Sequence, residues 1–263
     1  MNDTSVLLTR EHDDGRIVVL TLNRPAALNA IDDALAQALE AEAQRLAHDG
    51  RVEAVVLTGA GRAFSSGGDI GSFKSALAGG GFGELPALLD RLATRVHGAI
   101  ETLSGIGSVL ITAVNGSATG GGLGLACAGD VAYAQPGTTL RPGFARLGLS
   151  PDSGTTYQLA RLIGYRRALE FLLRGEPLAA PEALKLGLFN EIIDADGEAF
   201  VAQAVERARK LIASGRAARE TRRLLRHSPQ ASLHEQLELE KASLIALAQD
   251  ERAGALLKQA LGL

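Results

Sequence analysis

Short apolar runs separated by glycine-rich turns fill the first part of the chain, and they predict buried strands. The segments RIVVLTL at 16–22, VEAVVLTG at 52–59 and SVLITAVNG at 108–116 are rich in β-branched residues and end at turn signals. Residues 30–50 and 88–104 instead place apolar side chains at helical spacing. The repeated order of strand, turn and helix indicates an α/β protein.

Two further segments of this region carry weaker signals. AFSSGGDI at 63–70 is typical of a glycine turn that ends at a helix start, with Asp69 as the capping residue. Residues 71–83 contain AGGGFG, and we expect them to form a flexible loop, either a lid or pocket rim or a plain surface loop.

The pattern changes after about residue 155. Strand signals become rare, and Ala, Leu, Arg and Glu dominate to the end, which predicts a mostly helical C-terminal part. Its amphipathic pattern suits packing on the core, on another subunit, or on both.

Composition narrows the possible functions. A net charge of −3 over 263 residues gives no reason to expect nucleic-acid binding, and the basic stretch at 216–226 is typical of a solvated helix face. No apolar segment reaches the ~18 residues of a membrane span, and the N-terminus lacks the pattern of a signal peptide. The single cysteine, Cys127, permits no disulfide within the chain and is expected to fill the core. The single cysteine also fits a reducing cytosol, so we expect a cytoplasmic protein. The five histidines are scattered, so we expect no metal site.

Two glycine turns are the candidates for chemistry. SSGGD follows the strand at 52–59, and TGGGLG follows the strand at 108–116. Each turn exposes backbone N–H groups, and two such groups that converge on one point would form an oxyanion hole. The helix expected after Gly121 adds a partial positive charge. Neither turn has the spacing of a phosphate loop or of a dinucleotide-binding fingerprint.

The chain also resembles a known family. LNRPAALNAID, GAGRAFSSGGDI, ITAVNGSATGGGLGLACAGDVAYA and LGLSPDSGTTYQLARLIG occur in the order found in the crotonase, or enoyl-CoA hydratase/isomerase, superfamily. The resemblance extends over roughly residues 5–195, and more weakly to about 258, so we divide the chain into a core domain at 1–195 and a helical region at 196–263. It implies a spiral of ββα repeats in the core and a helical C-terminal region that forms a homotrimer or a dimer of trimers. It also implies an acyl-CoA substrate and no permanently bound cofactor. By matching positions, the N–H groups of Gly68 and Gly121 hold the thioester oxygen.

The positions of acidic residues indicate which reaction to expect. The hydratases of the family carry two glutamates, at the places where this chain has Gly124 and Gly143. Asp152 stands where the enoyl-CoA isomerases carry an acidic residue, with very similar surroundings in the isomerase of ring-epoxidised phenylacetyl-CoA. The resemblance therefore favours an isomerase with Asp152 as a single base. The alternative for Asp152 is an ordinary helix cap.

A second subfamily offers a different reaction. The 4-chlorobenzoyl-CoA dehalogenases are similar in GGGLG and in SPDSGTTYQLARLIGYRRALEFLL, and they use an Asp nucleophile with a His that activates water. Asp152 and His97 would take these roles in a dehalogenase or thioester hydrolase. Against this reading, that subfamily carries a Trp at the place of Phe144 and an aromatic residue at the place of Gly68. An altered hydratase, or a scaffold that only binds CoA or RNA, is a further alternative.

Contacts with the substrate are assigned from the resemblance. The backbone of Ala63, Ser65 and Gly67 is expected to contact adenine, while Phe73, Phe82 and Phe144 shape the acyl pocket. Family members often carry a basic residue two positions after the Pro of NRP, where this chain has Ala27. The candidates for the CoA phosphates are Arg24, Arg62 and, from a neighbouring subunit, Lys258. Asp69 lies beside these contacts and is expected to cap its helix.

Overall fold

A six-stranded sheet forms the centre of the computed structural model, which describes residues 4–80 and 83–262. Its strands, in spatial order, are β1 (Leu7–His12), β2 (Ile17–Leu22), β3 (Ala54–Gly59), β5 (Val109–Val114), β7 (Val131–Ala134) and β10 (Glu191–Ile192). Strand β1 pairs antiparallel with β2, and the other neighbours are parallel. Strands β3 and β5 are buried at every position, which explains their unbroken apolar sequences.

A second, smaller sheet lies beside the first and carries the glycine turns. It contains β4 (Ala63–Ser65), β6 (Ser117–Thr119), β8 (Thr139–Arg141) and β9 (Leu178–Ala179) in that order. Strand β4 follows β3 directly, and β6 follows β5, so each repeat contributes one strand to each sheet. Because β4, β6 and β8 are parallel, the turns that follow them meet at one edge of the small sheet.

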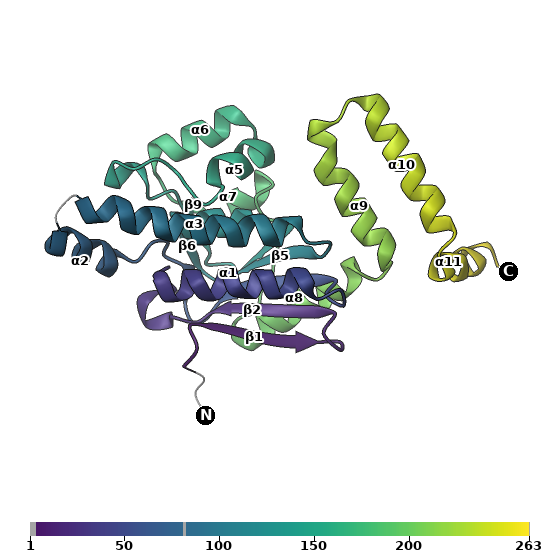
Figure 1. The fold of residues 1–263 in the computed structure, drawn as a ribbon, viewed down its shortest axis with the longest axis horizontal. Coiled ribbons are helices and arrows are strands. Elements are labelled where there is room, and N and C mark those ends of the chain that lie inside the picture. Colours follow the sequence, from purple (N-terminus) through teal and green to yellow (C-terminus); the bar gives the residue numbers. More distant parts are fainter. Residues whose placement is uncertain (1–3, 81–82, 263) are drawn as a thin grey trace.

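Two layers of helices cover the large sheet. Helices α1 (Asp33–His48) and α3 (Glu84–Gly105) lie side by side over one face, as Figure 1 shows. Asp32 caps α1 by accepting the Leu35 N–H at 2.9 Å. Helix α8 (Gly197–Leu211) packs on the opposite face through buried residues such as Phe200 and Ala204. The central strands β2, β3 and β5 are therefore buried on both faces of the sheet, whereas the edge strand β1 is largely exposed.

The other helices surround the small sheet or extend away from the body. They are α2 (Ile70–Gly80), α4 (Gly121–Cys127), α5 (Thr155–Ile163), α6 (Tyr165–Arg174) and α7 (Ala180–Lys185), followed after α8 by α9 (Arg216–His227), α10 (Leu233–Ala248) and α11 (Glu251–Leu261). Figure 1 shows α9, α10 and α11 as an arm to one side of the body. The division after residue 195 stays a prediction, although α8 itself contributes to the core.

The α/β class, the three strands and the helical C-terminal part are confirmed. Two local predictions differ. The expected loop at 71–83 is helical up to Gly80, while its residues 81–82, including Phe82, lie outside the described residues. The expected turn at 63–70 begins with the three-residue strand β4, which is too short to leave a sequence pattern. Cys127 is buried as expected, and burial raises its pKa to about 12. No helix within residues 4–80 and 83–262 is long and apolar enough to cross a bilayer.

The basic stretch at 216–226 is not the wholly solvated helix face that the sequence predicts. Arg222 has a side chain only 9% exposed, and its guanidinium lies 2.6 Å from the Asp130 carboxylate. It also donates to the backbone carbonyls of Ile106 and Ser104. Arg226 binds the second oxygen of Asp130 at 2.8 Å. These bonds attach α9, and with it the arm, to the end of the large sheet.

We predict that Arg222→Met lowers the free energy of unfolding by about 3 kcal/mol, because it leaves a half-buried carboxylate and two carbonyls short of a partner. Urea titration measures the change. The matched control on the same helix is Arg223→Met, since Arg223 is 49% exposed in its pair with Glu220 and should contribute less than about 1 kcal/mol. Equal effects of the two substitutions would show that Arg222 is not an anchor.

Candidate functional site

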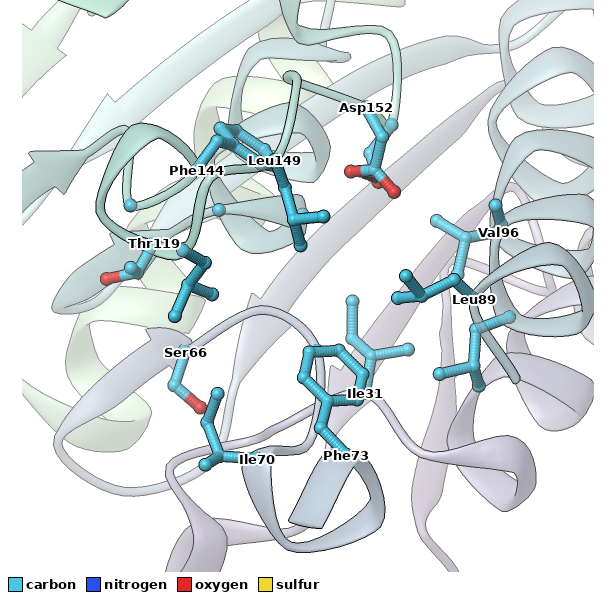
Figure 2. Close-up of a pocket in the computed structure, with 18 of the residues that line it drawn as sticks. Ile31, Ser66, Ile70, Phe73, Leu89, Val96, Thr119, Phe144, Leu149 and Asp152 are labelled. Carbon is cyan, nitrogen blue, oxygen red and sulfur yellow. Dashed lines mark hydrogen bonds between the residues drawn. The ribbon is translucent and has the colours of Figure 1, made fainter. Parts of the chain in front are cut away.

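A cavity of about 490 Å³ brings together the residues that the sequence singles out. Gly68, Gly121 and Asp152 all line it, with the expected acyl-pocket residues Phe73 and Phe144. Most of the remaining lining is aliphatic, and Figure 2 shows Ile31, Ile70, Leu89, Val96 and Leu149 around the same space. The site is therefore an apolar chamber with a few polar groups, which is the usual form of a small-molecule site.

The two glycine turns meet because their strands are parallel neighbours. Gly68 lies just after β4, and Gly121 begins α4 just after β6. A Cβ on Gly67 would lie 2.6 Å from the Thr119 carbonyl oxygen and 3.1 Å from the Gly121 nitrogen, so the contact between the turns excludes any side chain there. In the described part of the chain, the N–H groups of Gly68 and Gly121 donate no hydrogen bond within the protein. Both are available to a ligand.

An aromatic ring covers Gly68. A Cβ at this position would lie 2.5 Å from the Phe73 ring, which comes from the first turn of α2. Figure 2 shows the Phe73 ring on the side of the cavity opposite Asp152. The Phe73 ring thus forms the cavity wall next to the Gly68 N–H.

Asp152 belongs to a tight backbone turn. Its main-chain carbonyl accepts the Thr155 N–H at 2.9 Å and the Thr155 hydroxyl at 2.6 Å, and its carboxylate Oδ1 accepts the Ser153 hydroxyl at 2.9 Å. Helix α5 has Gly154 as its N-cap, without a side-chain cap. Asp152 is therefore not the side-chain cap that the sequence allows. Its carboxylate points into the cavity, as Figure 2 shows.

His97 lies behind this turn. It comes from α3 and is not among the described residues that line the cavity. Its Nε2 accepts the backbone N–H of Ser153 at 3.1 Å. An imidazole nitrogen that accepts a hydrogen bond carries no proton, so in this arrangement the ring proton of the neutral imidazole is on Nδ1.

Neither of the two positions at which the hydratases carry a glutamate, Gly124 and Gly143, readily accepts a side chain in this structure. A Cβ on Gly124 would lie 2.4 Å from the Ser153 carbonyl oxygen and 2.6 Å from the Ser153 Cβ. Gly143 has a φ of +75°, a conformation that side chains disfavour, and its Cβ would lie 3.1 Å from the Thr119 methyl group. The turn that carries Asp152 thus fills the place where a side chain of residue 124 would begin.

Two of the residues predicted to contact CoA, Arg24 and Asp69, are bonded to each other and to neighbouring groups of the protein. The Arg24 guanidinium lies 2.9 Å from both the Asp32 and the Asp69 carboxylate. Asp69 caps α2 by accepting the Ser72 N–H at 3.0 Å. Burial alone would raise the pKa of Asp69, but the Ser72 N–H and the Arg24 guanidinium outweigh burial and lower its pKa.

The backbone segment expected to contact adenine also makes bonds inside the fold. The Ala63 carbonyl accepts the Asn29 amide, the Ser65 hydroxyl donates to the Asn29 carbonyl, and the Gly67 carbonyl accepts the Ile31 N–H. Arg62 on this segment and Lys258 on α11 are exposed, and neither is among the described residues that line the cavity.

Several lining residues were not predicted from the sequence. Leu89, Val96 and Asp90 come from α3, whose opposite side packs on α1, and a helical pattern alone does not separate the two faces. Asp90 is the only described lining residue besides Asp152 that carries a carboxylate. Among the described residues, no cluster of three or more His, Cys, Asp or Glu side chains could hold a metal ion.

Sequence comparison places the chain among enzymes named for acyl-CoA substrates. The family model described as enoyl-CoA hydratase/isomerase matches residues 12–256. The chain is 35% identical over 206 residues to 4-chlorobenzoyl coenzyme A dehalogenase-1 from Arthrobacter sp., covering 78% of this chain and 71% of that protein. It is 32% identical over 196 residues to 1,2-epoxyphenylacetyl-CoA isomerase from Escherichia coli (strain K12), covering 74% and 73%.

Similarity to solved structures extends over almost the whole chain. The enoyl-CoA hydratase from Bacillus anthracis superimposes with a TM-score of 0.85 at 26% identity, covering 98% of this chain and 96% of that one. The sheet-and-helix architecture is thus the crotonase fold, including the helical arm. From the family model, these relatives and this fold, the chain belongs to the enoyl-CoA hydratase/isomerase family.

Proposed function

We propose that the protein is an acyl-CoA isomerase that moves a double bond, or rearranges a ring-derived acyl group, with Asp152 as its one acid/base residue. The observation that carries the proposal is the position of this carboxylate. Its Oδ1 lies 3.7 Å from the point where a Cβ on Gly121 would be, at the candidate oxyanion hole. Its Oδ2 has no hydrogen-bond partner among the described residues, and is therefore free to accept a proton.

The chemistry follows from the two glycine N–H groups and this oxygen. When the thioester oxygen binds the N–H groups of Gly68 and Gly121, removal of a proton from the α-carbon places negative charge on that oxygen. Each such donor typically contributes about 3 kcal/mol to the transition state. With a 3-enoyl-CoA, Asp152 takes the α-proton, the C–H electrons form a dienolate, and the same carboxyl returns the proton to the γ-carbon. The double bond moves by one position, and Asp152 regains its charge.

The apolar wall suits this reaction. Leu89, Val96 and Leu149 face the cavity and offer no groups that would orient a water molecule. Asp152 is exposed in the single chain, so a bound acyl chain must displace water from the cavity before the carboxylate can transfer a proton without competition from solvent. The wall therefore supports proton transfer within the acyl chain and gives less support to water addition.

A dehalogenase or thioester hydrolase is the first alternative, because one relative is named as a dehalogenase. In that reaction Asp152 would attack the acyl group and His97 would activate water. With Nε2 bonded to the Ser153 N–H and the proton on Nδ1, His97 has no free lone pair to accept a proton from water. This bond is the observation that favours the isomerase.

A hydratase by an altered route is the second alternative. Water addition uses two acid/base groups, and Asp90 is the lining carboxylate that could join Asp152. A scaffold that binds CoA or RNA without catalysis is the third, and unbonded N–H groups at Gly68 and Gly121 argue against it, since a scaffold does not need them.

The proposal includes assembly and location. Residues of the arm such as Leu233 and Leu244 are more than 70% exposed in the single chain, and we infer that they are covered in a homotrimer or a dimer of trimers in the cytoplasm. A neighbouring subunit would then supply Lys258 to the CoA phosphates. Arg24 is a weaker candidate because its two carboxylate partners already neutralise it.

We predict that Asp152→Asn lowers kcat for conversion of a 3-enoyl-CoA to the 2-enoyl-CoA by about 100-fold or more, because general acid/base catalysis typically contributes 10²–10⁴. Binding of acetoacetyl-CoA, followed by its enolate absorbance, should persist, since the oxyanion donors are backbone groups. Undiminished isomerisation would rule out Asp152 as the base. Absence of CoA binding by the unaltered protein would rule out every enzymatic reading.

The matched control is Asp90→Asn, the same change at the other lining carboxylate. The isomerase proposal predicts a change in kcat of less than about threefold, whereas the hydratase alternative predicts loss of water addition in both variants. A single turnover in ¹⁸O-labelled water separates the remaining alternative. Label in the Asp152 carboxyl would reveal a covalent aspartyl ester and support the dehalogenase or hydrolase.

We predict that Gly124→Ala lowers the free energy of unfolding by about 1–3 kcal/mol, the usual cost of overpacking. It should also reduce kcat. The new Cβ would lie 2.4 Å from the Ser153 carbonyl oxygen, so the backbone of Ser153 would have to move, and Asp152 with it. Urea titration and the isomerase assay measure the two effects. The control is Gly105→Ala at the end of α3, where no described atom lies within 4 Å of the new Cβ, so stability should change by less than about 1 kcal/mol. A stable, fully active Gly124→Ala protein would contradict the packing argument.

A further inference from the structure

We propose that His97 is a positioning residue, which holds the Asp152 carboxylate at the oxyanion hole through the backbone of Ser153. This inference rests on the proposed role of Asp152 as the acid/base residue. It assigns His97 a function that requires the imidazole as a hydrogen-bond acceptor and not as a base.

The turn that carries Asp152 needs an external support because its backbone is strained. Ser153 has a φ of +52°, in the left-handed region that a non-glycine residue rarely adopts, and it is only 2% exposed. Such a conformation is energetically unfavourable and persists only where the surroundings enforce it. The bonds between Asp152 and Thr155 close the turn, but they do not attach it to the rest of the protein.

Two contacts attach the turn, one on each side. On one side, His97 of α3 accepts the Ser153 N–H at 3.1 Å. On the other side, the Ser153 carbonyl oxygen and Cβ press against Gly124 of α4, and the Ser153 hydroxyl oxygen lies 3.1 Å from the Cβ position of Gly121. The packing on α4 prevents movement toward the glycine helix, and the His97 bond prevents movement away from α3.

Ser153 also fixes the Asp152 carboxylate. The Ser153 hydroxyl donates to Asp152 Oδ1 at 2.9 Å, so the orientation of Ser153 determines where Oδ2 points. If the Ser153 N–H lost its acceptor, a buried donor would be unpaired, and the strained turn would relax. A misplacement of about 1 Å can reduce a rate by about 10²-fold. His97 therefore affects proton transfer without touching the substrate.

The experiment compares His97→Gln with His97→Phe. The glutamine side chain can place its Oε1 where Nε2 lies and so retains an acceptor, whereas phenylalanine keeps a ring without one. We expect His97→Phe to lower kcat for 3-enoyl-CoA isomerisation by about 10- to 100-fold with KM within about threefold. His97→Gln should stay within about threefold of the unaltered protein in both constants. The control is His48→Gln, an exposed histidine on α1 whose bond within the described residues is to the Gln44 carbonyl of its own helix.

Two outcomes would overturn the proposal. Full activity of His97→Phe would show that the bond is not needed. Equal loss in His97→Gln and His97→Phe would show that imidazole chemistry, such as water activation, is required.

A second measurement separates this proposal from the proposed function. ¹⁵N NMR of histidine-labelled protein, assigned with His97→Gln, should report the Nδ1–H form of His97. Exchange of the α-protons of a saturated acyl-CoA with D₂O then tests Asp152 without reference to double-bond migration. Exchange that falls in His97→Phe and persists in His97→Gln would support positioning even if no isomerisation occurs. An Nε2–H form, or exchange unaffected by His97→Phe, would refute it.

Discussion

The close contact between the Asp152–Gly154 turn and helix α4 is the constraint on which the site depends. Ser153 packs where a side chain on Gly124 would begin, so the helix must be bare backbone at that position. The same contact brings the Asp152 carboxylate beside Gly121, the first residue of the helix. The same packing interaction therefore leaves no room for a side chain at residue 124 and places the Asp152 carboxylate beside Gly121.

The rest of the fold positions the other groups of the site. Parallel pairing of β4 with β6 brings the turns of Gly68 and Gly121 together, and Phe73 and the residues of α3 close an apolar chamber around them. Once a bound acyl chain has displaced water from this cavity, the two fixed N–H donors and the carboxylate would act on the substrate more strongly than in water, because the local dielectric would be lower. The architecture is common to the family, whereas our proposal of isomerisation rests on the placement of the acidic residue.

The sequence was sufficient to predict the elements whose hydrophobic periodicity extends over several residues. Long buried strands such as 52–59 and the glycine turns were recognisable because period, length and turn residues agree. Strands of three residues, such as β4 and β6, leave no period to detect. The prediction for Arg222 was wrong because a run of charged residues indicates only that a helix face is polar. The tertiary structure is needed to show that one arginine of this run, Arg222, faces Asp130. His97 was flagged, but its bond to a backbone N–H has no sequence signal.

A crystal structure with a bound enoyl-CoA analogue tests the central claim most directly. The account predicts that the thioester oxygen lies about 3 Å from the nitrogens of both Gly68 and Gly121. It also predicts that Asp152 Oδ2 lies on one face of the acyl chain, within about 3.5 Å of both the α- and γ-carbons. A thioester oxygen bound elsewhere, or an Asp152 carboxylate directed at the carbonyl carbon, would contradict the account.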